Sequence, residues 1–394
     1  MSRKIRYYDI NNEVFVASDV ALPELARFRV QRLTSEPTVR VRIPERGAPW
    51  AAPDSERAAP AGGRRVQYHD GLGRMGFGME IMYGQTGETI QVLASPLLAR
   101  SPHVLYTNVL EPVLRWTFVE KGYALVHGAC VAVDDRAYLI TARTDTGKTT
   151  TILRLLDNYR GISFLSDDLT LVQPDGTVLS YPKPLTISLH TMVAVNSPLL
   201  TRRERLTLPL QSRLHSKSGR MFGMLLAKTR IPMATMNAIV QMLVPPPKYH
   251  VERLVPHVTT PSNNPRLAGM FIIERGEDGV QTLSDTDAIE ILLENCEDAY
   301  GFPPYPEIKH LLYQTSERDL RPLERNVVAT ALSGLPAVLL RSSTRDWWRE
   351  LPAHMGISAP LSRSAIHLAE PGQSEQLSDL RGTLAPEPAQ LSGD

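Results

Sequence analysis

Residues 127–150 read HGACVAVDDRAYLITARTDTGKTT, and this stretch decides the fold of the chain. Apolar runs at Gly128–Val133 and Ala137–Ala142 flank the polar triplet Asp134-Asp135-Arg136, a pattern typical of two strands joined by a turn. Strands joined by so short a turn must be antiparallel neighbours. From Thr149 to Leu156 the apolar residues follow a helical spacing. The stretch therefore predicts an antiparallel hairpin, then a loop, then a helix.

The loop between the second strand and the helix matches a relaxed Walker A pattern, with alanine at its first position. Its candidate nucleotide-binding residues are Ala142, Arg143, Thr144, Asp145, Thr146, Gly147, Lys148, Thr149 and Thr150. Backbone N–H groups of such a loop, and the helix dipole behind it, attract phosphate oxygens. Gly147 permits close approach, Lys148 reaches the β- and γ-phosphates, and the Thr149 hydroxyl ligates Mg²⁺. The motif predicts binding of ATP with Mg²⁺; the alternative is a chance Gly-Lys-Thr at a strand-to-helix turn.

Two adjacent carboxylates, Asp167 and Asp168, end the predicted strand Ile162–Leu165 a short way beyond the loop. Phosphoryl transfer to a hydroxyl needs a metal to neutralise charge and a carboxylate to take the proton. Side chains of neighbouring residues point in different directions, so the pair could divide these duties. The alternative is a helix cap or a solvated turn. His127, one strand before the loop, is a further candidate beside the alternative of a structural histidine.

Length and composition fit an ordinary globular protein with more than one module. The chain has 394 residues, 42% hydrophobic and 22% charged, and a formal net charge of +1. A chain so close to neutral has no overall positive charge that would attract nucleic acid. Cys130 and Cys296 follow no metal-ligand spacing and are expected to be buried free thiols in a reducing cytosol. No signal peptide or transmembrane segment is expected, so we expect a cytoplasmic protein; a homo-oligomer remains open.

Changes in composition divide the chain into seven expected segments. They are a strand-rich segment 1–46, a flexible linker 47–63, a β/α region 64–121, a kinase core 122–199 that resumes at 261–351, a basic helical insertion or flap 200–260, and a disordered tail 352–394. Elements expected outside the loop region are strands near residues 28–41, 65–69, 89–93, 162–165, 169–173, 178–181, 267–274 and 336–341, an amphipathic helix 104–120, and a helix 285–296 capped by Ser284.

The basic segment carries a strong local charge bias. Between Arg202 and Arg253 there are ten Lys/Arg but only Glu204 and Glu252 as acids. A solvated helical face is one interpretation. A flap that attracts an anionic acceptor is the other, and it predicts that reversal of Arg213, Lys217 and Arg220 raises the Michaelis constant for the acceptor. Nucleic acid is not expected, because aromatic side chains for base stacking are almost absent.

The run His127-Gly128, the loop 142–149 and Ser166-Asp167-Asp168 together resemble the catalytic domain of bacterial HPr kinase/phosphorylase and related proteins. This resemblance covers about residues 122–190, and more weakly 267–341. It implies a fold related to phosphoenolpyruvate carboxykinase, with His127 hydrogen-bonded to a catalytic base Asp167, and Asp168 near the metal. The glycine-rich signature that follows the aspartates in the family is replaced by Tyr181-Pro182-Lys183-Pro184.

These observations predict an α/β (α+β) chain with a mixed or antiparallel kinase sheet. The predicted function is transfer of the γ-phosphate of ATP to a hydroxyl of a peptide, protein or small molecule. Catalysis is expected from Asp167, Asp168, His127 and Lys148, with Thr149 and Asp168 on Mg²⁺. The alternatives are a small-molecule kinase or NTPase of parallel topology, and a nucleotide-binding module without turnover.

Overall fold

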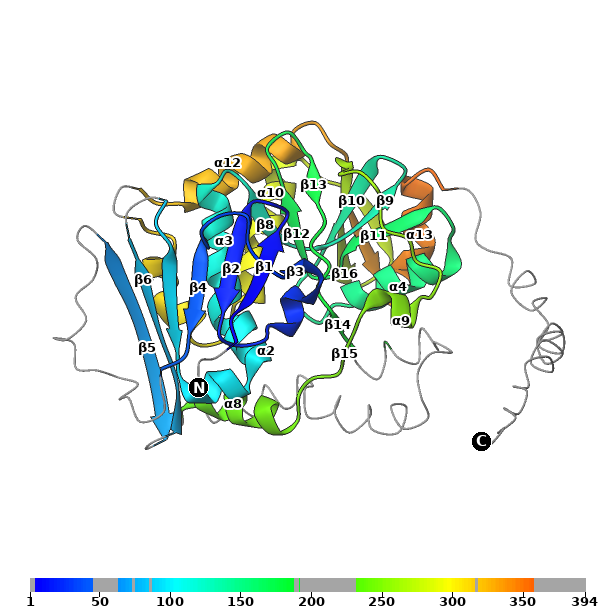
Figure 1. Ribbon diagram of the computed structural model, residues 1–394. Coiled ribbons are helices and arrows are strands. Elements are labelled where there is room, and N and C mark those ends of the chain that lie inside the picture. The colour runs from blue at the N-terminus through cyan, green and yellow to red at the C-terminus, as the bar shows by residue number, and fades with distance from the viewer. Residues whose placement is uncertain are drawn as a thin grey trace, which may run out of the picture.

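The computed structural model describes residues 4–44, 63–72, 75–84, 87–187, 191, 232–315 and 318–357. Within these ranges the chain forms two large β-sheets that lie side by side, with helices between and around them (Figure 1). One sheet is built from the N-terminal strands, and the other contains the strands that lead into the 142–149 loop. The protein is therefore of mixed α/β class, as the sequence predicts.

The N-terminal sheet has seven strands in the order β3-β1-β2-β4-β7-β6-β5. Their bounds are β1 Arg6–Ile10, β2 Val14–Ser18, β3 Arg29–Val30, β4 Val39–Arg42, β5 Arg64–Leu72, β6 Met75–Tyr83 and β7 Ile90–Ala94. β5 and β7 confirm two predicted strands. The strand expected over 28–41 is wrong in extent, since Phe28 ends the 3₁₀ helix η1 (Pro23–Phe28) and residues 31–38 belong to no strand. Polar turn-forming residues there precede Pro37, which has no N–H to donate.

A nearly continuous helical stretch follows that sheet. It consists of α1 Pro96–Arg100, α2 Pro102–Leu105, the π-helical turn η2 Tyr106–Leu110 and α3 Glu111–Glu120. The predicted helix over 104–120 is confirmed, and it ends at Lys121 before Gly122, whose φ is 85°. Its predicted amphipathic character is wrong: every residue from Glu111 to Val119 is buried. The helix is enclosed by the N-terminal core on one side and by β8, α11 and α12 on others.

The second sheet has six strands in the order β11-β9-β10-β16-β18-β17. They are β9 Ala129–Val133, β10 Arg136–Thr141, β11 Ile162–Ser166, β16 Arg266–Arg275, β17 Gly279–Thr282 and β18 Ala337–Ser342. β9 is antiparallel to β10 and β11, whereas β10, β16 and β18 run parallel. The predicted hairpin is confirmed, and the sheet is mixed.

Alternation along these strands places helices on both faces of the second sheet. Val131 and Ile140 face a core shared with α4 (Lys148–Asn158) and α13 (Trp347–His354). Cys130 and Leu139, one position along, face a core shared with α10 (Asp285–Ala299) and α12 (Arg321–Leu332). Since successive side chains of a strand point to opposite faces, apolar residues at both parities require cover on both sides.

Two small sheets join the large ones. β8 (Ala124–His127), β12 (Leu169–Val172) and β13 (Val178–Leu179) form a three-stranded antiparallel sheet, with β12 in the middle. β14 (Leu185–Thr186) pairs with β15 (Lys248–Tyr249). The tight turn predicted at Pro174-Asp175-Gly176 joins β12 and β13, and Gly176 takes a φ of 83° there.

The described C-terminal elements agree with most of the predicted ones. β16 and β18 are the strands expected at 267–274 and 336–341, and Ser284 caps α10 by accepting from the Asp287 N–H at 3.2 Å. The sequence did not predict α11 (Tyr305–Leu312), nor did it predict β17, α12 and α13. The expected boundary at residue 352 falls inside α13, where Leu351 and Met355 are buried.

Several expected segments fall partly or wholly outside the described residues. These include residues 45–46 of the N-terminal segment, residues 47–62 of the linker, most of the basic segment, with Arg213, Lys217 and Arg220, and residues 358–394 of the tail. The described end of the basic segment forms α8 (Met233–Leu243), β15 and α9 (Val251–Leu254). Lys248 in β15 is ion-paired with Glu24 of η1. That lysine therefore does not belong to a solvated face.

Cys130 and Cys296 are buried and form no disulfide, as predicted. None of the helices in the described part of the chain combines the length and the apolar composition that a membrane crossing requires.

Candidate functional site

The candidate residues meet where the chain crosses from one sheet to another. β8 runs into β9 at His127-Gly128, and β11 runs into β12 at Asp167-Asp168. β8 pairs with β12, while β9 pairs with β11, so both crossings lie side by side. The Gly128 N–H donates to the Asp168 carbonyl oxygen at 3.0 Å. Pairing on both sides of the crossings therefore fixes His127 against the two aspartates.

The 142–149 loop completes the site from the end of β10. It has the predicted strand–loop–helix setting, because β10 ends at Thr141 and α4 begins at Lys148. Gly147 has a φ of 138°, and a Cβ there would lie 3.3 Å from the Trp347 ring. Both the backbone angle and the close ring favour glycine at this position.

Two side chains from other elements hold the loop. The Arg275 guanidinium at the end of β16 donates to the carbonyls of Asp145 and Thr146. The Thr144 N–H donates to Asp298 Oδ2 from α10 at 2.8 Å. Asp145 itself takes a φ of 64°, an angle that Asp tolerates better than most residues. The loop is thus anchored by one cationic and one anionic side chain.

Lys148 lies buried behind the loop, with 8% of its surface exposed. Its Nζ is 2.9 Å from the Ala142 carbonyl oxygen and 2.9 Å from Nε2 of His127. Burial lowers the pKa of Lys148, although nearby aspartates, led by Asp168, work in the opposite direction. The ammonium is therefore held in place by neutral acceptors and surrounded by acidic groups at longer range.

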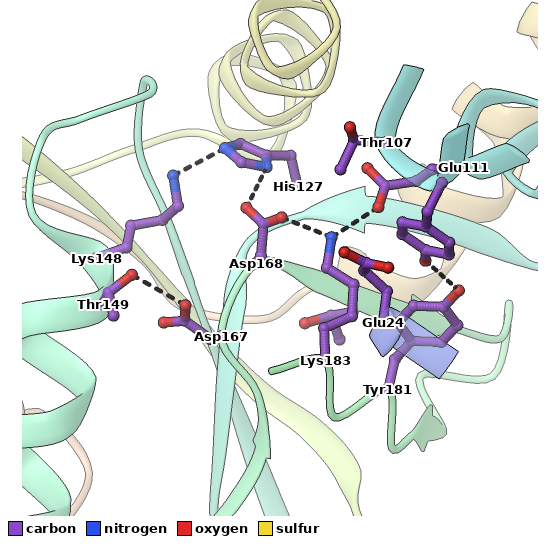
Figure 2. Close-up of polar contacts among 12 residues, drawn as sticks. Glu24, Thr107, Glu111, His127, Lys148, Thr149, Asp167, Asp168, Tyr181 and Lys183 are labelled. Atoms are coloured by element: carbon purple, nitrogen blue, oxygen red, sulfur yellow. Dashed lines mark hydrogen bonds and ion pairs between the residues drawn. The ribbon is translucent and has the colours of Figure 1, made fainter. Parts of the chain in front are cut away.

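His127 connects the loop lysine to Asp168 (Figure 2). Since its Nε2 accepts from the ammonium, the remaining ring proton is assigned to Nδ1, which faces Asp168 Oδ1 at 3.4 Å. Burial, and then the Lys148 charge, lower the pKa of His127 to about 4. The imidazole is neutral at pH 7. The resemblance implied a bond from His127 to Asp167; that expectation is wrong, because the histidine faces Asp168.

Asp167 turns toward the loop helix. Its Oδ2 accepts from the Thr149 hydroxyl at 2.9 Å, and its Oδ1 is buried and finds no hydrogen-bond partner among the described residues. Burial, and then the neighbouring Asp168 charge, raise the pKa of Asp167 to about 7. A buried carboxylate oxygen without a donor is costly unless a proton or a cation satisfies it.

Asp168 turns the other way and is accessible. Its side chain is 44% exposed, and its Oδ2 lies 2.8 Å from Lys183 Nζ. Loss of solvation by itself would raise the pKa of Asp168, but Lys183 and then His127 outweigh it and hold that pKa well below its usual value. Asp168 is thus the ionised member of the pair.

Lys183 and Glu111 are functional candidates that the sequence did not reveal. Lys183 Nζ bridges Asp168 Oδ2 at 2.8 Å and Glu111 Oε2 at 2.7 Å, and both partners of the second pair are buried. These two carboxylates raise the pKa of Lys183 against the effect of burial. The available signals were a lysine between two prolines and an acid at the first position of a helix rich in apolar residues. Neither signal says that the two residues meet.

A second buried ion group lies beside Glu111 and Lys183. Glu24 Oε1 accepts from Lys248 and from Nδ1 of His103, the latter at 2.7 Å. Burial would raise the pKa of Glu24, but Lys248 and His103 together lower it to about 2. The group ties η1, α2 and β15 together next to the Asp168 side of the site.

The residues around Asp167 fit a magnesium ion. The orphan Asp167 Oδ1 and the Thr149 hydroxyl are hard oxygen ligands of the kind that Mg²⁺ prefers. Among the described residues, no group of three or more His, Cys, Asp or Glu is placed to hold a metal. Mg²⁺ usually takes one or two protein ligands and completes its shell with water and substrate phosphates.

Neither a scan against protein-family models nor a search of the curated proteins returned a match to this chain.

Proposed function

We propose that the chain is a Mg²⁺- and ATP-dependent kinase that transfers the γ-phosphate to a hydroxyl group. One observation carries the proposal: the residues proposed for the nucleotide side, Lys148, Thr149 and Asp167, directly adjoin Asp168, an accessible ionised carboxylate. His127 links the two sides through contacts to Lys148 and Asp168. Phosphoryl transfer needs these two halves in contact, with the acceptor in line with the leaving oxygen.

The nucleotide half would act mainly through charge and position. Backbone N–H groups at the start of α4 and the Lys148 ammonium would bind phosphate oxygens. Mg²⁺, when bound, supplies the positive charge that neutralises the phosphates, and Thr149 and Asp167 would hold it. Binding of a cation would also satisfy Asp167 Oδ1, which has no donor among the described residues.

The acceptor half would act through Asp168. Asp167 is 7% exposed and its free oxygen is buried, whereas the Asp168 side chain is 44% exposed. An acceptor hydroxyl would therefore reach Asp168, which takes the proton as the hydroxyl oxygen attacks phosphorus. This assignment reverses the roles that the resemblance implied for the two aspartates. His127 and Lys183 would act as positioning residues that orient the carboxylate from both sides.

The sheet gives the proposal further support. β10, which leads into the loop, has an antiparallel neighbour in β9 and a parallel neighbour in β16. The resemblance to HPr-kinase-like proteins implies entry from an antiparallel hairpin, whereas ordinary P-loop folds enter from a parallel central strand. The arrangement favours the first over a small-molecule kinase or NTPase of all-parallel topology.

The decisive test is transfer of label from γ-labelled ATP into a lysate of the native host. Wild type with Mg²⁺ should label a discrete acceptor, and Lys148→Ala and Asp168→Asn should not. ATP binding without transfer to any acceptor would instead support a nucleotide-binding module without turnover. Labelling that survives both substitutions would overturn the proposal.

A further inference from the structure

Asp298 places a carboxylate against the backbone of the 142–149 loop. Its Oδ2 accepts from the Thr144 N–H at 2.8 Å, although Asp298 is exposed and belongs to the last turn of α10. Loop N–H groups of this kind are the groups that bind phosphate oxygens in nucleotide sites. An internal anion thus occupies one donor of the loop.

The charge of Asp298 reaches the centre of the site. Burial lowers the pKa values of Lys148 and His127, and the Asp298 charge is one of the groups that act against this lowering at both side chains. Asp298 itself contacts the loop at the Thr144 N–H. Lys148 is the residue expected to contact the β- and γ-phosphates, and His127 lies toward the acceptor side. Asp298 therefore borders the part of the loop where the terminal phosphate would lie.

No interaction within α10, which the structure describes in full, stabilises an acidic side chain at position 298. The last turn of the helix contains Glu297 and Asp298 and no basic residue. Carboxylates at a helix C-terminus are unfavourable, because they meet the negative end of the helix dipole. Glu297 is compensated by Arg115 and Lys309, whereas the Asp298 carboxylate accepts a hydrogen bond from the loop. The contact with Thr144 is what this carboxylate gains.

We propose that Asp298 is a specificity residue that sets how strongly the loop discriminates against uncompensated charge on the terminal phosphate. Its carboxylate repels a γ-phosphate that arrives without Mg²⁺. For that phosphate to bind the Thr144 N–H, the Asp298 carboxylate must first release this N–H. A Mg²⁺-bound triphosphate, whose charge is partly neutralised, is repelled less, and a diphosphate does not reach this part of the loop. The inference rests on the proposed nucleotide site. It adds that Asp298 weakens the binding of metal-free ATP most, that of Mg²⁺-ATP less, and that of ADP least.

Asp298→Asn is the informative change, because the amide keeps the shape and an acceptor oxygen for Thr144 but removes the charge. The probes are ATP in EDTA, ATP with Mg²⁺, and ADP in EDTA, each titrated calorimetrically. We expect the dissociation constant for metal-free ATP to fall roughly tenfold, that for Mg²⁺-ATP roughly threefold, and that for ADP less than twofold. Glu294→Gln, an exposed acid one turn earlier on α10, removes the same charge and should change all three less than twofold.

Other outcomes overturn the inference in recognisable ways. An equal change for ATP and ADP, or none, would make Asp298 only an anchor of the loop, and Asp298→Ala would then weaken both nucleotides alike. Weaker Mg²⁺-ATP binding by Asp298→Asn alone would indicate a metal ligand instead. If the wild-type protein bound neither ATP nor ADP, the proposed function itself would fail. That result differs from every outcome above, because each of those requires measurable binding by the wild type.

Discussion

Lys183 Nζ lies 2.8 Å from Oδ2 of Asp168, and together with His127 on the other oxygen it holds that carboxylate between two partners. The lysine is buried and shares its charge with Glu111 at 2.7 Å. A carboxylate held in this way keeps its orientation and its charge, so it can accept a hydrogen bond from an acceptor hydroxyl and orient that hydroxyl for transfer.

Lys183→Met should destabilise the protein and slow transfer. Removing one member of a buried ion pair leaves Glu111 uncompensated, at a cost of about 3 to 5 kcal/mol in the free energy of unfolding. The double variant Lys183→Met/Glu111→Gln should recover part of that stability in a denaturant titration but not the turnover number. Lys183→Arg, which keeps the charge, should recover some turnover. A double variant with wild-type turnover would show that Lys183 is purely structural.

Lys148→Ala should abolish Mg²⁺-dependent ATP binding, because the ammonium supplies a charge for the phosphates. It should also lower the free energy of unfolding by about 1 to 3 kcal/mol, since Lys148 is buried and its loss leaves His127 Nε2 and the Ala142 carbonyl without this donor. Calorimetric titration with ATP, alongside a thermal unfolding curve, measures both effects. Equal ATP affinity for wild type and variant would remove the nucleotide role of the loop.

The two aspartates should differ in how Mg²⁺ affects their variants. Asp168→Asn removes the proton acceptor, so transfer should fall by about a hundredfold or more at every Mg²⁺ concentration, with ATP binding retained. Asp167→Asn weakens the metal site, so its loss of transfer should shrink as Mg²⁺ is raised. Steady-state rates over a Mg²⁺ series separate the two. If the responses were exchanged, Asp167 would be the base, as the resemblance implied.

Asp167 should also make the metal-free protein less stable as the pH rises. Its pKa is raised to about 7 in the fold, so its folded form holds a proton that the unfolded chain releases near pH 4. The stability linked to that proton is present below about pH 4 and is lost as the pH rises through about 7. In EDTA, Asp167→Asn should therefore gain about 2.6 kcal/mol on wild type between pH 5 and pH 8.

A matched control for this measurement is Asp134→Asn in the exposed β9–β10 turn, where the φ of 53° suits asparagine. Its difference from wild type should stay constant over the same range. A constant difference for Asp167→Asn as well would show that burial does not perturb that carboxylate.

The sequence by itself determined the elements that rest on local patterns. The alternation in residues 129–141 specifies the β9–β10 hairpin, and the helical spacing after Gly147 specifies α4. The cap at Ser284 and the turn at Gly176 likewise depend on a few consecutive residues. The 142–149 loop, the two aspartates and His127 were recognisable as candidates because each lies at the end of such a locally determined element.

Only the tertiary structure decided which of these groups touch. Strand pairing at the two sheet crossings brings His127 to Asp168 rather than to Asp167, since the two aspartates leave the crossing in opposite directions. Lys183 is hydrogen-bonded to Glu111 although 72 positions separate them. The sequence pattern around either residue does not predict this contact. The same reason explains α3, whose amphipathic pattern gave no sign that it is enclosed on all sides. Ionisation and burial depend on neighbours brought together by folding, and these neighbours assign the roles within the site.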